Sequence, residues 1–100
     1  MLEVPIPALQ DAIRHLHGCE STFVEAVPVR EEFQGQVAWV GQVCVFDLIG
    51  HPTATRAYAW SHATEGTRRR FVAVLHSGPI DSPQNAVKAA IVSEAKASLN

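Results

Sequence analysis

One short segment carries four side chains that can bind a partner or a ligand, and they stand at alternate positions: Arg56, Tyr58, Trp60 and His62. Alternate residues of a β-strand point to the same face of a sheet, so these side chains share a face if the segment is a strand. Tyrosine, tryptophan and arginine are enriched at the centres of protein interfaces, and aromatic rings also stack on bases. We therefore interpret this face as a candidate surface for a protein partner, a ligand or nucleic acid. The alternative is an ordinary sheet face, because aromatic residues favour strands in any case.

A run of three arginines follows at positions 68–70. A guanidinium group can hold a phosphate or a carboxylate through two parallel hydrogen bonds. In a strand, Arg68 and Arg70 share one face and Arg69 points to the other, which makes Arg68 and Arg70 candidates for phosphate binding. The alternative is a solvated run of charge that protects the edge of a sheet.

A possible metal site is suggested by three side chains with nitrogen or sulfur atoms that can bind zinc: His15, His17 and Cys19. The two histidines would lie about 200° apart on a helix, and no second paired cluster exists to complete a zinc site. Glu94 falls on the apolar side of the predicted last helix. There it either meets a basic group across the sheet or reaches water at the end of the helix. We expect no metal and no cofactor.

Catalysis has little support in the sequence. Histidines at 51, 62 and 76 could be paired with acids at 47 and 81. However, the sequence contains no nucleophile elbow, glycine-rich phosphate loop or HExxH motif. We therefore assign no catalytic residue and favour a non-catalytic protein. The alternative is a small ligand-binding domain or enzyme with a pocket between helices and sheet, using His62 or His76.

Two helices are predicted to frame the central segments. Apolar residues spaced at i, i+3, i+4 and i+7 predict a helix over 8–18, and Gly18 supplies its C-terminal stop. Pro83 predicts the first turn of a second helix, which Asp81 or Ser82 would cap.

Four segments between these helices predict strands, because they are rich in β-branched and aromatic residues. Pro28 predicts that the first of them lies at an edge, since proline cannot donate to a ladder; whether it joins the main sheet stays open. The fold class is α+β: a helix, a three- to four-stranded antiparallel meander and a helix, with both helices packed on one face of the sheet. The predicted strands cover residues 22–30, 37–49, 55–63 and 68–76.

The segment 37–49 is apolar on both of its faces. Such a strand must be covered twice, and two helices on one face would leave the other bare. We therefore expect either a second sheet layer or another subunit to cover it, which is the main reason to expect a homo-oligomer, most simply a homodimer. Residues 1–50 hold seven acidic and two basic side chains, whereas residues 51–100 hold three acidic and six basic ones. This polarity could orient the partner.

Composition sets the outer limits. One hundred residues, of which 47% are hydrophobic and 18% charged, correspond to one globular domain over 1–100. No apolar run is long enough to span a membrane and no signal peptide is visible, so we expect a cytoplasmic protein with Cys19 and Cys44 as thiols. A net charge of −2 argues against bulk electrostatic binding of nucleic acid.

The order of elements over 37–99 resembles the double-stranded RNA-binding domain. The likeness rests on a histidine- and proline-containing loop and on an alanine-rich last helix. The resemblance implies RNA binding, with the first helix and this loop in the minor groove and lysines at the start of the last helix on phosphates. Those lysines are absent here. The loop is Gly50-His51-Pro52, the helix residues are Ser82, Ala86 and Ala89-Ala90, and the lysine positions hold Pro83, Gln84 and Asn85.

These observations favour a small, non-catalytic, cytoplasmic binding or association module that associates with itself. The alternative is a nucleic-acid-binding domain that uses the face containing Arg56, Tyr58, Trp60 and His62.

Overall fold

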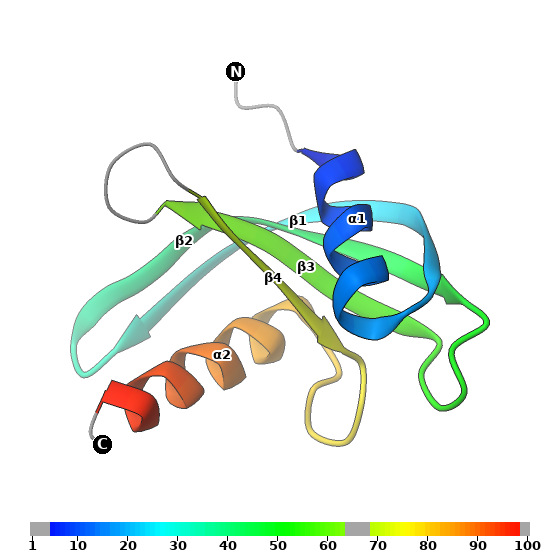
Figure 1. Cartoon of the computed structure of the whole chain (residues 1–100). Helices are drawn as coiled ribbons and strands as arrows, with labels where there is room; N and C mark the ends of the chain where they lie inside the picture. The colour runs from blue at the N-terminus through cyan, green and yellow to red at the C-terminus, as the bar shows by residue number, and fades with distance from the viewer. Residues whose placement is uncertain (1–4, 64–68, 99–100) are drawn as a thin grey trace.

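The computed structural model of this chain describes the backbone of residues 5–63 and 69–98 and the side chains of residues 5–61 and 70–93. An N-terminal helix leads into a four-stranded antiparallel sheet whose strands are neighbours in chain order, and a C-terminal helix follows (Figure 1). The predicted α+β class and the order helix, meander, helix are confirmed. The elements are α1 (Ile6–His17), β1 (Glu20–Phe33), β2 (Gln36–Ile49), β3 (Arg56–Ala63), β4 (Arg69–Leu75) and α2 (Pro83–Ser98).

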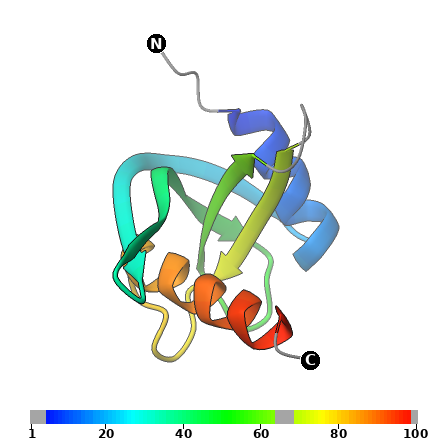
Figure 2. The same cartoon turned by 90° about the vertical axis from the view of Figure 1, so that its left-hand side faces the viewer.

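Strand β1, which contains the predicted strand 22–30, joins the sheet as an edge strand beside β2. The two strands are each 14 residues long and form an extended hairpin. In contrast, β2 pairs with β3 only from Cys44 to Asp47. The outer part of the hairpin therefore extends beyond the rest of the sheet, toward α2 (Figure 2).

The two helices cover opposite faces of the sheet, so the prediction that both pack on one face is wrong. Along β2, Cys44 and Phe46 pack in the cluster that contains the α1 residues. Their neighbours Val43 and Val45 pack in the cluster that contains the α2 residues. Because successive strand residues point to opposite faces, the two clusters lie on either side of the sheet.

This arrangement removes the argument for a homodimer at the centre of β2, and self-association stays a prediction. The central residues of β2, 43–46, are at most 3% exposed, because helices of the same chain cover both faces of the strand. Large exposed apolar residues of β2 occur only toward its ends, at Val37, Val40 and Ile49. The doubly apolar pattern was therefore correctly identified, but the second cover is α2 rather than a second copy.

A β-bulge changes which face of the sheet β1 presents. The register between β1 and β2 shifts between Phe23 and Glu25. Phe23 consequently packs with the α1 cluster, whereas Val27, four residues later, packs with the α2 cluster. An extra residue in one strand reverses the alternation beyond it, so β1 contributes to both cores.

The ends of both helices follow the predicted signals. Gly18 adopts the left-handed conformation at φ 71°, and its N–H donates to the carbonyl of Arg14 at 2.9 Å. Ser82 caps α2, because its Oγ accepts a hydrogen bond from the Asn85 N–H at 3.1 Å. No helix within the described ranges is long and apolar enough to cross a membrane.

Candidate functional site

Rows of side chains cross β3 and its neighbours on the α2 face. Antiparallel register places Trp60 opposite Val72, and Tyr58 opposite both Val45 and Val74. The next row is polar, because Asp47 is paired with Arg56 and the His76 N–H donates to the Arg56 carbonyl at 2.9 Å. The α2 face is therefore apolar beneath the helix and polar at one rim. The rows are Trp60–Val72, Val45–Tyr58–Val74 and Asp47–Arg56–His76.

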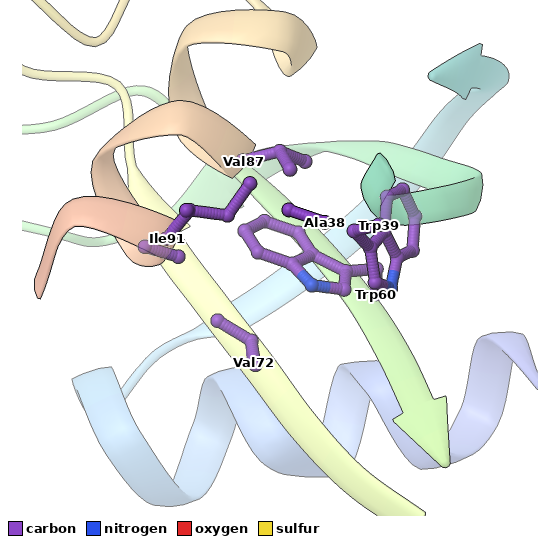
Figure 3. A pocket seen from close by; sticks show the side chains of 7 residues that line it. Ala38, Trp39, Trp60, Val72, Val87 and Ile91 are labelled. Atoms are coloured by element: carbon purple, nitrogen blue, oxygen red, sulfur yellow. The ribbon is translucent and has the colours of Figure 1, made fainter. Parts of the chain in front are cut away.

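Both tryptophans of the sequence line a small pocket between α2 and the sheet (Figure 3). Their ring centroids lie 5.9 Å apart, with the planes tilted by 55°. Trp60 is almost fully buried, Trp39 is partly buried, and the exposed residue Ala38 lies at the mouth. The Trp39–Trp60 pocket, as we call it, is lined by Ala38, Trp39, Trp60, Val72, Val87, Ala90 and Ile91.

Trp39 occupies this position because Gly41, two residues along the same face of β2, has no side chain. A Cβ atom on Gly41 would lie 2.8 Å from Cζ2 of Trp39, well inside van der Waals contact. Glycine inside a strand commonly marks such a close approach. The indole ring of Trp39 therefore lies over the backbone of its own strand and beside Trp60.

The size and chemistry of the Trp39–Trp60 pocket restrict what it can hold. Its volume is about 60 Å³ and every lining residue carries an apolar side chain. Sites for drug-sized ligands are about 300–1,000 Å³, and a dry apolar cavity of about 150 Å³ admits benzene. The pocket therefore fits one short aliphatic group rather than a whole metabolite.

The four residues predicted to form a recognition face have separate environments. Tyr58 and Trp60 are each 3% exposed and pack beneath α2, so they do not form the expected open stacking surface. Trp60 instead reaches the Trp39–Trp60 pocket. Arg56 lies at the polar rim and pairs with Asp47 at 3.2 Å. The side chain of His62 lies outside the described residues.

Only one of the two phosphate-binding candidates can be placed. Arg68 lies outside the described residues. Arg70 is exposed and lines a shallow depression of about 300 Å³ between β4 and α2. This depression shares Val72 and Ala90 with the Trp39–Trp60 pocket, so the two lie next to each other. Phosphate binding by these arginines stays a prediction.

The His15, His17 and Cys19 side chains do not converge. His15 is exposed, Cys19 is buried in the α1 cluster, and Nε2 of His17 lies 2.9 Å from the carbonyl oxygen of Ala73. Across the described residues, no group of three His, Cys, Asp or Glu side chains could hold a metal ion. The side chain of Glu94 lies outside the described part.

At the polar rim, a phenol and an imidazole form a close pair. The Tyr58 hydroxyl lies 2.6 Å from Nδ1 of His76. Burial raises the pKa of Tyr58, while the positive charge of Arg56 lowers it and the negative charge of Asp81 raises it further. The phenol therefore remains protonated at neutral pH. His76, with Asp47, Thr55 and Arg56, lines a second surface depression.

The loop and helices that carried the family resemblance are arranged for other contacts. Nδ1 of His51 accepts hydrogen bonds from the backbone N–H groups of Thr53 and Ala54, at 3.2 and 2.9 Å, and so holds its own turn. The order of elements agrees with the resemblance. However, α1 and α2 lie on opposite faces, so they do not offer one surface to a single duplex.

No family model, curated protein or solved structure matches this chain.

Sequence reasoning missed the partners of Trp60 in the pocket. Trp39, Val87 and Ile91 come from β2 and α2, and local spacing does not show that these elements meet. One signal was present: the sequence contains only two tryptophans, and one of them stands two residues before a glycine in the most apolar strand. A strand glycine beside an indole indicates a ring lying on the backbone.

Proposed function

We propose that this chain is a small non-catalytic binding module that holds one aliphatic side chain of a partner polypeptide in the Trp39–Trp60 pocket. The observation that carries the proposal is that both tryptophans line a pocket of about 60 Å³ between α2 and the sheet, with their rings side by side. Tryptophan at an apolar pocket is a common anchor site in protein recognition.

The small volume favours a polypeptide over a free metabolite. Burying a few CH₂ groups contributes roughly 0.8 kcal/mol for each one, which is too little to hold a small molecule tightly. Additional affinity must come from the surface around the pocket. The depression between β4 and α2 supplies such a surface, because it shares Val72 and Ala90 with the pocket and includes exposed Ser93.

The indole N–H signals give a direct test by NMR, since both tryptophans line the pocket. Titration with N-acetyl-leucinamide is expected to shift both signals with weak, millimolar affinity, whereas N-acetyl-glycinamide leaves them unchanged. Ala90→Leu fills the cavity and is expected to abolish the response. Gln84→Leu, on an exposed part of the same helix, is the matched control and keeps it. No shift, or a shift that persists in Ala90→Leu, would exclude the pocket as the site.

A second experiment tests the class of partner. Short peptides selected from a random library against the intact chain are expected to share one aliphatic residue and to bind more tightly than the single amino acid. Their binding should be lost in Ala90→Leu and retained in Gln84→Leu. Sedimentation equilibrium of the chain alone checks the competing possibility, because a dimer that dissociates on addition of the peptide would make a second copy the partner.

A further inference from the structure

A row of three polar side chains crosses β2, β3 and the end of β4 at the rim of the α2 face. We propose that this row, Asp47–Arg56–His76, binds a small oxyanion group, a phosphate or a carboxylate, which displaces Asp47 from Arg56. The site is distinct from the Trp39–Trp60 pocket, since the two depressions share no lining residue. Its test does not depend on the proposed polypeptide partner.

Register, rather than chance proximity of flexible side chains, brings these groups together. Asp47 and Arg56 are directly paired across β2 and β3, and the backbone of His76 is hydrogen-bonded to that of Arg56. All three residues, with Thr55, line one surface depression. Adjacent antiparallel strands hold directly opposite Cβ atoms about 4.5–5.5 Å apart, so the guanidinium and imidazole groups start from neighbouring positions on a rigid sheet.

The ion pair within the row is looser than the pairs that Arg14 and Arg30 make with their acidic partners. Nε and Nη2 of Arg56 both donate to a single oxygen of Asp47, at 3.3 and 3.2 Å. Charge-assisted bonds of this type are usually about 2.7–2.9 Å. Arg14 meets Glu20 at 2.6 Å and Arg30 meets Glu32 at 2.7 Å. An oxyanion that offers two oxygens would therefore satisfy Arg56 better than Asp47 does.

The buried neighbour Tyr58 is a positioning residue for His76. The hydroxyl oxygen of Tyr58 lies within hydrogen-bond distance, 2.6 Å, of Nδ1 of the imidazole. When the protonated phenol donates to Nδ1 of the neutral ring, the ring proton resides on Nε2, which then serves as a donor. Arg56, His76 Nε2–H and the Thr55 hydroxyl together provide hydrogen-bond donors of the kind that an oxyanion requires, and no acidic residue other than Asp47 lines the depression.

The test is an NMR titration of the intact chain with inorganic phosphate, and separately with acetate, at constant ionic strength. We expect saturable shifts of the Arg56 Nε and His76 ring signals. Arg56→Gln is expected to weaken binding at least about tenfold, because it removes the charged donor. Arg30→Gln removes an exposed arginine that also pairs with an acidic side chain in another part of the sheet, and it should leave binding unchanged. The stronger of the two anions identifies whether phosphate or carboxylate is preferred.

Two further variants separate this proposal from general attraction of anions. Asp47→Asn removes the internal competitor and is expected to tighten binding about threefold to tenfold. Tyr58→Phe is expected to change the tautomer of His76, seen in the ring nitrogen shifts, and to weaken binding while Arg56 remains in place. Shifts that rise linearly without saturation, equal losses in Arg56→Gln and Arg30→Gln, or weaker binding in Asp47→Asn would overturn the proposal.

Discussion

The two faces of the sheet are packed by different means, although the same strands build both. On the α1 side, β3 presents Ala57 and Ala59, which are fully buried in the cluster packed against α1. On the α2 side, β3 presents Tyr58 and Trp60, and a cavity remains between Trp60 and the helix. Alternate residues of one strand thus face the closely packed layer on one side and the layer with a pocket on the other.

The difference suggests that small side chains favour a face that stabilises the fold, whereas large side chains favour a face that can bind a partner. Alanines on a sheet let a helix approach closely enough to fill the interface at the density of a protein interior. Large rings carry more apolar area, and beside Trp60 the contact with α2 leaves a small pocket. We infer that the α1 face mainly stabilises the fold, whereas the α2 face carries both candidate sites.

The largest expected difference between the two faces is in the free energy of unfolding lost when an isoleucine of each helix is replaced by alanine. Ile13→Ala on α1 removes a fully buried side chain and is expected to cost about 3–5 kcal/mol of unfolding free energy. Ile91→Ala on α2 removes a partly buried side chain beside an existing cavity and is expected to cost about 1 kcal/mol. Both positions are helical, so the change in helix propensity cancels. Urea denaturation measures both, and equal losses would contradict the comparison.

Enlarging a side chain should have opposite consequences on the two faces. Ala59→Leu overfills the α1 cluster, where Ala59 is fully buried, and is expected to cost about 1–3 kcal/mol. Ala90→Leu places its added atoms in the cavity under α2 and is expected to change stability by less than about 0.5 kcal/mol. Gln84→Leu controls for the leucine itself. A large loss in Ala90→Leu would show that the pocket is not available space.

A further expected effect is a dependence of stability on alkaline pH that arises on the α1 face. Burial raises the pKa of Cys44 from 9.0 to about 11. The thiol therefore ionises in the unfolded chain before it ionises in the folded one, so stability is lost as pH rises from 9.0 to about 11. Urea denaturation across this range is expected to show a shallower loss in Cys44→Ala than in the original chain. Parallel pH profiles would indicate that Cys44 is not responsible.

Local signals predicted the elements well because they act within a few residues. The spacing of Leu9 and Ile13 gave the first helix, Gly18 gave its end, and Ser82 gave the cap of the second. These are contacts over one or two helical turns, whose outcome depends little on the rest of the fold. The same holds for the order of strands, since short connections join antiparallel neighbours.

The candidate sites could be predicted only in part. Arg56, Tyr58 and Trp60 were correctly placed on one face of one strand, but their burial depends on where α2 lies. The pairing of Trp39 with Trp60, and of Arg56 with Asp47 and His76, depends on register across the sheet. Register is set by bulges and by packing of whole faces, which alternation within one segment does not specify.

The sequence by itself determined the helices, the strands, the α+β class and the fact that the central strand is apolar on both faces. Tertiary structure alone decided that α1 and α2 cover opposite faces, and hence that no second copy is needed to bury that strand. The physical reason is that covering either face of a strand with two apolar faces buries apolar surface and is favourable to a similar degree. Along β3, alanines lie under α1 and aromatic side chains lie under α2.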